Sequence, residues 1–476
     1  MESIKIFLAG EMIETASTLK VYNPWSGEIF ATTFNAGEKE LNKAIQSALS
    51  VKEKLRQMPV YQRSNILLQI RDRLMEMKEI FAETICKESG KPIINSRIEV
   101  DRSIGIFTIA AEEARRLPKE YISLDWVPSG EDREAIVKHF PIGIVGGISP
   151  FNFPLNLAVH KIAPAIAAGV PIILKPSSTT PLTTLLLAGL ISETELPKGA
   201  VSILPMDRKT GNQLVTDERI SMISFTGSQG VGWKMKEQAG KKKVILELGG
   251  NAAVIVSENS NMQEAVSKCV ASAFSYAGQT CISTQRIFVQ ENIFSLFVER
   301  LKAQAEKLKS GDPSNDDTQI SVLIDEENAV RIEDWVNEAR QGGATIITGG
   351  TRTGSFYRPT ILTGTNNSMK VRSEEVFGPV VILEKYTTFQ EAVDLVNESK
   401  YGLQAGVFTN LYSEMNYAFN RLEVGGVIIN DSPSYRSDHM PYGGVKESGF
   451  GREGVKYAIQ DMLEPRVMVI PSTRYY

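Results

Sequence analysis

Three reactive or polar side chains stand beside glycine or proline in otherwise apolar segments. They are Cys281 in GQTCIS, Glu247 in LELGGN and Asn152 in SPFNFP. A thiol, a carboxylate and a primary amide are the groups that serve as nucleophile, general base and oxyanion donor in covalent acyl chemistry. The three residues therefore suggest one reaction, if the fold brings them together.

Each of these residues also has a structural interpretation. A lone cysteine is commonly a buried packing residue, although Cys281 has small or polar neighbours and follows a predicted helix at a loop, where backbone amides can favour a thiolate. Acids at strand ends usually face water, but Gly249 and Gly250 let the chain turn sharply beside Glu247, where burial would raise the pKa of a base. Asn152 lies between two prolines that stiffen its loop, and it can equally be a turn residue.

A glycine-rich turn, FTGSQGVG from Phe225 to Gly232, follows an apolar run and opens a predicted helix. Backbone N–H groups at such a helix start can bind a pyrophosphate. The turn lacks the GxGxxG spacing of the dinucleotide fingerprint. Lys175, at the end of PIILKP, can reach a ribose or a phosphate, and it can also be a surface lysine whose stem lies along the protein.

The elements that must position these groups follow an alternating pattern. Apolar stripes predict one early helix around residues 41–48 and a second over 66–81. From Gly143 onward, short apolar runs alternate with helical stretches up to Glu247, which is typical of a parallel sheet flanked by helices. A second series follows, with helices near 262–276, 294–308 and 326–340 and strands near Ile346, Val380 and Val407.

Composition excludes several classes of protein. The net charge of −4 provides no basic field for nucleic acid. The N-terminus does not resemble a signal peptide, and the most apolar stretch contains His160, Lys161 and two prolines, so neither export nor a membrane span is expected and the protein is predicted to be cytoplasmic. Three scattered cysteines and three histidines without ligand spacing predict free thiols and no metal site.

Taken together, the motifs resemble the aldehyde dehydrogenase superfamily. The similarity runs from NPWSGE to GFGREG and includes SPFNFP, KPSSTTPL, FTGS, LELGGN, GQTC, EEVFGPV, YGLQAGVFT and MPYGGVKESGFGRE in the family's order. The resemblance implies NAD(P)+-dependent oxidation of an aldehyde to a carboxylic acid. Cys281 would form a thiohemiacetal and then a thioester, Asn152 would hold the oxyanion, and Glu247 would activate the hydrolytic water.

The resemblance also implies a fold and a set of boundaries. The expected fold class is α/β, with a Rossmann-like cofactor-binding domain, a second α/β catalytic domain and a small β oligomerisation flap. The expected segments are 1–118 and 140–247 for the NAD(P)-binding domain, 248–463 for the catalytic domain, and 119–139 with 464–476 for bridging strands. The flap hairpin near Tyr121 to His139 and the C-terminal run EPRVMVIP would pair across subunits in a homodimer or homotetramer, although a solvent-exposed excursion is the alternative.

For the cofactor, the family pattern implies contacts from Ser149, Pro150, Lys175, Ser178, Gly211, Phe225, Gly227, Ser228, Leu248, Gly249, Glu375 and Phe377. Ser178 departs from the glutamate of many NAD-preferring relatives. A hydroxyl there removes a charge that would repel the 2′-phosphate, so acceptance of NADP is expected beside NAD.

The substrate implied by the nearest branch is a small hydrophilic aldehyde of the lactaldehyde or glyceraldehyde-3-phosphate type. Candidate contacts are Arg102, His160, Thr280, Arg436 and His439. Arginines and histidines near helix ends are commonly structural. Thr280 stands where phosphonoacetaldehyde-type relatives place an arginine, which disfavours a phosphonate and favours an uncharged or differently anchored substrate. Two alternatives stay open: a CoA-acylating or acyl-phosphate-reducing member of the fold, against which Glu247 argues, and a non-catalytic nucleotide-binding relative.

Overall fold

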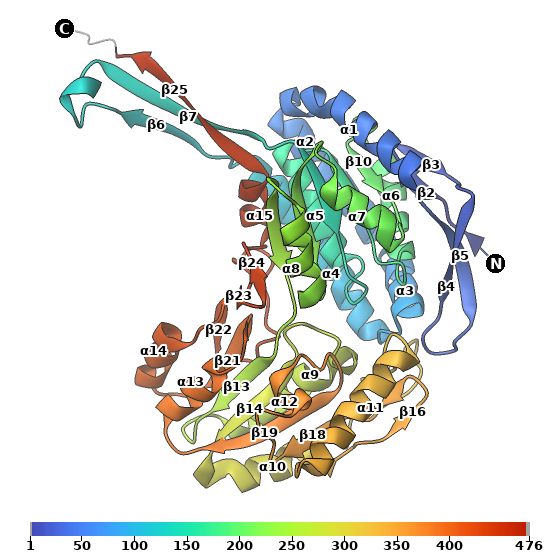
Figure 1. Ribbon diagram of the computed structural model, residues 1–476, viewed down its shortest axis with the longest axis vertical. Helices are drawn as coiled ribbons and strands as arrows, with labels where there is room; N and C mark the ends of the chain where they lie inside the picture. Colours follow the sequence, from blue (N-terminus) through green and yellow to red (C-terminus); the bar gives the residue numbers. More distant parts are fainter. Residues whose placement is uncertain (1, 473–476) are drawn as a thin grey trace.

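The computed structural model describes residues 2–472 and has two α/β bodies, each built around one large sheet, with a β-arm projecting from the upper body (Figure 1). The predicted α/β class with a small β-flap is confirmed. Within the described residues, no helix is both long and apolar enough to cross a membrane.

The upper sheet has eight strands in the order β24-β12-β11-β8-β9-β10-β2-β3. Its centre is the predicted parallel series: β8 (Ile144–Ile148), β9 (Ile172–Lys175), β10 (Val201–Ile203), β11 (Ile220–Thr226) and β12 (Lys243–Glu247). The sequence did not predict its antiparallel edges, which come from the chain ends: β2 (Ile6–Leu8) and β3 (Glu11–Ile13) on one side and β24 (Gly449–Phe450) on the other. Residues 449–461 thus return to the upper body.

The helices of this body are α1 (Glu38–Gln57), α2 (Val60–Glu76), α3 (Lys78–Ser89), α4 (Ile93–Ala114), α5 (Asn156–Ala168), α6 (Leu182–Ser192), α7 (Arg208–Thr216), α8 (Gln229–Gln238) and α15 (Val455–Asp461). Helix α5 is buried at every position, because α2, α4 and α15 pack against it. The single helix predicted over 66–81 is wrong: the chain leaves helical geometry at Met77 (φ −98°, ψ 14°), and α3 begins at the next residue.

The lower sheet has seven strands in the order β15-β18-β19-β14-β13-β21-β22. They are β13 (Ala252–Val256), β14 (Thr284–Gln290), β15 (Thr345–Thr348), β18 (Thr360–Thr363), β19 (Val380–Tyr386), β21 (Gln404–Phe408) and β22 (Gly426–Ile429). The flanking helices are α9 (Met262–Phe274), α10 (Glu291–Ala305), α11 (Glu326–Gln341), α12 (Lys370–Ser373), α13 (Phe389–Asn397) and α14 (Tyr412–Arg421). All neighbouring pairs of this sheet are parallel except β15 with β18, which is antiparallel.

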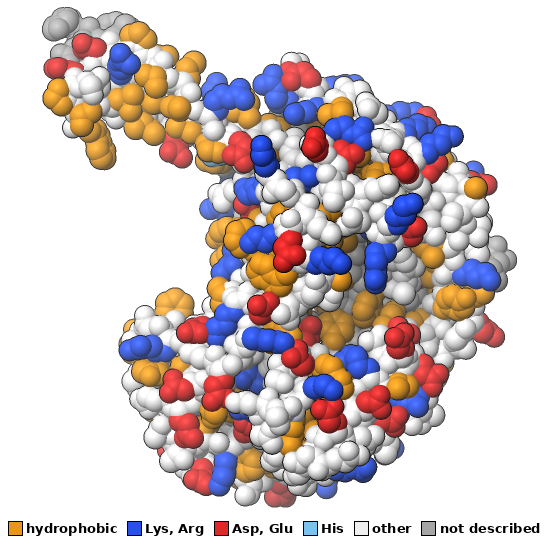
Figure 2. All heavy atoms as spheres, viewed as in Figure 1, with side chains coloured by type: hydrophobic (Ala, Val, Ile, Leu, Met, Phe, Trp, Pro, Cys, Tyr) orange, Lys and Arg blue, Asp and Glu red, His pale blue; other side chains and the backbone are white. Residues whose placement is uncertain are grey.

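The arm is a three-stranded antiparallel sheet of β6 (Lys119–Ser123), β7 (Arg133–Pro141) and β25 (Leu463–Pro471), with the 3-10 turn η1 (Pro128–Gly130) at its tip. The predicted hairpin is present, and β25 pairs with β7 of its own chain. Residues 473–476 of the expected bridging segment lie outside the described residues. Hydrophobic side chains gather on the arm (Figure 2), and Trp126 is 89% exposed.

Smaller sheets complete the fold. One joins β1 (Glu2–Ser3), β5 (Ile29–Asn35) and β4 (Ser17–Tyr22), and two short ribbons pair β16 (Arg352–Thr353) with β17 (Phe356–Tyr357) and β20 (Tyr401–Gly402) with β23 (Val445–Lys446).

Candidate active site

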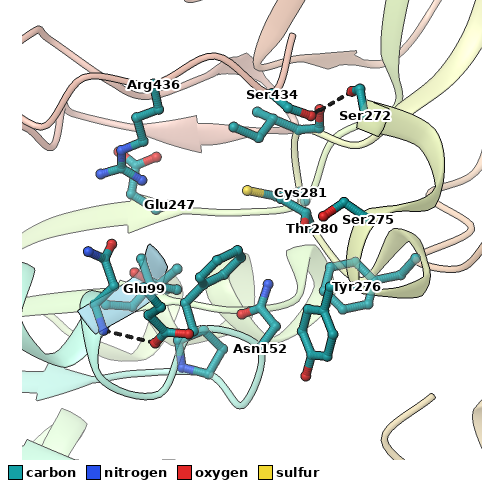
Figure 3. Close-up of a pocket in the computed structure, with 18 of the residues that line it drawn as sticks. Glu99, Asn152, Glu247, Ser272, Ser275, Tyr276, Thr280, Cys281, Ser434 and Arg436 are labelled. Atoms are coloured by element: carbon teal, nitrogen blue, oxygen red, sulfur yellow. Dashed lines mark hydrogen bonds between the residues drawn. The ribbon is translucent and has the colours of Figure 1, made fainter. Parts of the chain in front are cut away.

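A cavity of about 840 Å³ lies between the two bodies, and it is lined by loops that leave the carboxyl ends of upper-sheet strands and by segments of the lower body. Ligands of parallel α/β sheets bind at these strand ends. Cys281, Glu247 and Asn152 all line this cavity. In Figure 3 the Cys281 sulfur points toward the side that holds Glu247 and Arg436, and Asn152 lies below Cys281 in the view.

A strained turn presents Cys281. Helix α9 ends at Phe274, and Tyr276, Ala277 and Gly278 then adopt left-handed φ values of 49°, 51° and 70°. The first two are not glycines, so the turn costs about 1 kcal/mol or more at each of them. A Cβ on Gly278 would collide with the carbonyl oxygen of Gly378, so glycine is required there by this close approach of two backbone segments. The turn leaves the Cys281 side chain only partly buried.

Glu247 ends β12 and is 3% exposed. Among the described residues, none hydrogen bonds to either of its carboxylate oxygens. Burial raises the pKa of Glu247 well above its ordinary value, and the nearby Glu453 carboxylate raises it further. A buried carboxyl without a partner is costly as a structural feature, whereas it suits a group that takes up a proton during a reaction.

Asn152 follows β8, and its Nδ2 donates to the Gln279 carbonyl oxygen at 2.9 Å. Its loop is held by Glu99, whose Oε1 accepts hydrogen bonds from the backbone N–H groups of Leu155 (3.0 Å) and Asn156 (3.1 Å). The amide nitrogen carries two hydrogens, so one N–H remains for a ligand.

Buried charges lie behind Glu247. Glu453 pairs with Lys161 at 2.9 Å and with Arg436 at 3.3 Å. Burial alone would raise the pKa of Glu453, but Lys161, His160 and Arg436 outweigh it and lower the pKa to about 2. Glu453 therefore stays ionised, and its negative charge adds to the burial that raises the pKa of Glu247.

A second group of buried charges centres on Asp438. Its carboxylate accepts a hydrogen bond from Arg102 at 2.6 Å and lies 3.0 Å from Nε2 of His160. Burial and Arg436 lower the pKa of His160, whereas the Asp438 hydrogen bond opposes them. Among the described residues, no group of three or more His, Cys, Asp or Glu side chains could hold a metal ion.

The predicted cofactor residues fall into two groups. Seven line the cavity: Pro150, Gly227, Ser228, Leu248, Gly249, Glu375 and Phe377. The other five, which are not among the lining residues, are Ser149, Lys175, Ser178, Gly211 and Phe225. Lys175 and Gly211 are neighbours, because a Cβ on Gly211 would lie 3.0 Å from Cε of Lys175.

These residues fit a dinucleotide. Burial lowers the pKa of Lys175, whose hydrogen bond to the Pro176 carbonyl oxygen is long at 3.4 Å, and the Ser149 hydroxyl is buried without a described partner. Such groups are suited to a polar ligand. Glu375 accepts from the Gly250 N–H at 3.0 Å, and burial raises its pKa to about 7.

Of the predicted substrate residues, Arg102, Thr280 and Arg436 line the cavity with Cys281, and His160 and His439 do not. His160 is buried behind it, against Arg436 and Asp438. His439 lies beside Ser437, with 2.9 Å between Nδ1 and Oγ.

Sequence reasoning missed five residues of the site: Tyr442, Glu453, Lys161, Lys91 and Glu99. Lys91 pairs with Glu99, and its ammonium lies 3.8 Å from the Phe153 ring centroid. Two of the five could have been found from the sequence, since Tyr442 and Glu453 belong to the MPYGGVKESGFGRE motif.

Comparisons with known proteins agree with this geometry. Residues 12–468 match the model described as "Aldehyde dehydrogenase family". A 3-sulfolactaldehyde dehydrogenase of Priestia aryabhattai is 43% identical over 467 residues, covering 98% of this chain and 97% of that protein.

Two solved structures are also similar. Aldehyde dehydrogenase 21 of Physcomitrella patens, in complex with its reaction product succinate, has a TM-score of 0.97 and 43% identity, covering 99% of this chain and 98% of that one. Glyceraldehyde-3-phosphate dehydrogenase of Methanocaldococcus jannaschii, complexed with NADP, has a TM-score of 0.92 and 38% identity, covering 95% and 99%.

Proposed function

Since the chain belongs to the aldehyde dehydrogenase family, we propose that it oxidises a small aldehyde that carries an anionic group, through a covalent bond to Cys281. The observation that carries the choice of substrate is a donor of a residue in the cavity wall: among the described residues, none hydrogen bonds to the buried Nε of Arg436, whose ion-pair partner Asp438 lies 3.6 Å away.

The residues divide the reaction between them. The Cys281 thiolate attacks the aldehyde carbon, and the free N–H of Asn152 together with the Cys281 backbone N–H holds the resulting oxyanion. When bound, the nicotinamide of NAD(P)+ supplies the hydride acceptor. Glu247 then takes a proton from the water that attacks the thioester, which releases the acid and frees the thiol.

The anionic group is proposed to bind at Arg436 and Arg102. Both line the cavity that contains Cys281, and Arg436 is only 8% exposed at its side chain. A guanidinium in such a setting binds carboxylate, sulfonate or phosphate oxygens through directed N–H groups. The molecules named for three relatives carry such a group: a sulfonated aldehyde, the dicarboxylate succinate and a phosphorylated aldehyde. The lactaldehyde named for other relatives is uncharged.

Initial rates with matched aldehydes test this proposal. We expect kcat/KM for succinate semialdehyde to exceed that for butanal, its uncharged counterpart of equal chain length, by about tenfold or more, since a hydrogen bond to a charged group contributes about 1.5–3 kcal/mol. Lactaldehyde, glyceraldehyde 3-phosphate and 3-sulfolactaldehyde complete the panel. Equal kcat/KM values for the charged and uncharged members would contradict anion recognition and leave aldehyde oxidation in place.

NADP is the proposed cofactor beside NAD. Ser178 is partly buried and lies in the loop after Lys175, with its hydroxyl 3.5 Å from the Met206 carbonyl oxygen. We expect Ser178→Glu to lower kcat/KM for NADP+ by about tenfold or more and to leave that for NAD+ much less changed, because a carboxylate would repel the 2′-phosphate. Thr179→Glu, at an exposed neighbouring position, is the matched control. A wild-type preference for NAD+ beyond about a thousandfold would refute the cofactor proposal.

We also infer that the arm packs on a second copy of the chain in a homodimer or homotetramer. Tyr121, Trp126, Val467 and Met468 are 64%, 89%, 58% and 51% exposed on it. Apolar side chains gathered in this way are typical of an interaction surface.

A further inference from the structure

The sulfur of Cys281 has a partner that the proposed reaction leaves without a role. The hydroxyl oxygen of Tyr442 lies 3.2 Å from Sγ, and the Tyr442 residue is only 4% exposed. Its ring packs with Ile282 and Leu403 beside the cysteine. We propose that Tyr442 acts directly on the nucleophile: its O–H donates a hydrogen bond to the Cys281 sulfur and stabilises the attacking thiolate. This inference rests on the proposed function of Cys281.

Backbone hydrogen bonds to Glu453, at the end of the MPYGGVKESGFGRE motif, fix the position of Tyr442. Tyr442 and Glu453 form an isolated antiparallel bridge, in which the Tyr442 N–H donates to the Glu453 carbonyl oxygen at 2.9 Å and the reverse bond is 2.6 Å long. The same Glu453 holds Lys161 and Arg436 through its carboxylate. The phenol therefore reaches the sulfur from a fixed position, and little conformational entropy is lost when the hydrogen bond strengthens.

Arg436 packs on the face of the Tyr442 ring, with its guanidinium carbon 3.8 Å from the ring centroid. A cation over an aromatic face is attracted to it, and the positive charge of Arg436 also acts to lower the pKa of Tyr442, against the larger effect of burial. A more acidic O–H is a better hydrogen-bond donor toward the sulfur.

The direction of the hydrogen bond follows from the charge state. In the thiol form either atom can donate, but a thiolate has no hydrogen, so the phenol must be the donor when the nucleophile is active. Burial raises the pKa of Tyr442 well above its ordinary value, so the hydroxyl keeps its proton at neutral pH. The bond therefore favours the charged form of Cys281 selectively.

Several groups around the sulfur shift the pKa of Cys281, and they act in opposite directions. Burial raises the pKa of Cys281 to about 11, against which the hydrogen bond from Tyr442 acts most strongly. Glu375 and Glu247 also raise the pKa of Cys281, and Arg436 lowers it. Tyr442 is thus a neutral neighbour that favours the thiolate, and its hydrogen bond lowers the pKa of Cys281 more than the charge of Arg436 does.

The test measures the thiol itself, without aldehyde or cofactor. The rate of Cys281 alkylation by iodoacetamide is followed against pH for the wild type and for Tyr442→Phe. We expect the midpoint to rise by about one pH unit in the variant. At neutral pH the thiolate then falls about tenfold, its intrinsic reactivity rises about threefold, and alkylation slows about threefold.

The matched control is Tyr435→Phe, which removes the hydroxyl of another tyrosine that lines the same cavity. Its midpoint is expected to equal that of the wild type. An unmoved midpoint in Tyr442→Phe, or an equal shift in the control, would overturn the proposal.

A second measurement follows the same ionisation without alkylation. The infrared S–H stretching band of Cys281 is isolated as the difference between the wild type and Cys281→Ala, in which Cys86 and Cys269 cancel. The band vanishes as the thiol ionises: we expect its midpoint against pH to lie about one unit lower in the wild type than in Tyr442→Phe, each measured against its own Cys281→Ala form, and equal midpoints would overturn the proposal. Both measurements are independent of turnover, so they can fail while aldehyde oxidation through Cys281 stands.

Discussion

Replacing Cys281 with serine is expected to lower kcat for aldehyde oxidation by about 10⁴-fold or more. A serine hydroxyl is far less acidic than a thiol, and the burial that already disfavours the Cys281 thiolate would disfavour an alkoxide more. Formation of reduced cofactor with time, at saturating aldehyde, measures the effect.

The matched control for this change is Cys86→Ser. Cys86 lies in α3, and burial raises the pKa of its thiol to about 12, so its chemistry is that of a packing residue. We expect the Cys86 variant to keep wild-type kcat. If Cys281→Ser retained a tenth of the wild-type rate, covalent catalysis at this sulfur would be excluded.

Replacing Glu247 with glutamine is expected to separate the two halves of the reaction. Acylation of Cys281 needs no base at position 247, so each active site should release one equivalent of reduced cofactor in a burst. Hydrolysis of the thioester should then slow by about 10² to 10⁴, the usual contribution of a positioned base. Rapid mixing with absorbance detection resolves the two phases.

The pH dependence gives this prediction a second readout. A base must be deprotonated to work, and burial together with Glu453 raises the pKa of Glu247. The wild-type hydrolysis rate should therefore increase with pH through a range above that of an ordinary carboxyl group, and this limb should be absent in Glu247→Gln. A variant that keeps both the limb and the wild-type steady-state rate would show that another group is the base.

Local sequence was sufficient for much of the scaffold. Alternating apolar runs predicted the parallel strands from β8 to β12, and the strands at Ile346, Val380 and Val407 are confirmed as β15, β19 and β21. Period-2 and period-3.6 patterns report which faces of an element are buried, and they depend only on neighbours in the chain. The break at Met77 was missed, because the apolar stripe continues across it to Phe81.

Local sequence patterns could not predict features that depend on contacts between residues far apart in the chain. Helix α4 was not predicted, and it supplies Arg102 and Glu99 to the site. Arg102 meets Asp438 across 336 residues of sequence, and Tyr442 meets Cys281 across 161. Such pairs are created by the return of the C-terminal segment to the upper sheet through β24, which no local periodicity encodes.

The most direct test of covalent chemistry is mass spectrometry of the Glu247→Gln protein, quenched with acid after mixing with succinate semialdehyde and NADP+. The account predicts that the peptide containing Cys281 gains the mass of a succinyl group in thioester linkage, with about one group per chain, and that Cys86 and Cys269 stay unmodified. A protein that forms the reduced cofactor while Cys281 never carries an acyl group would contradict it.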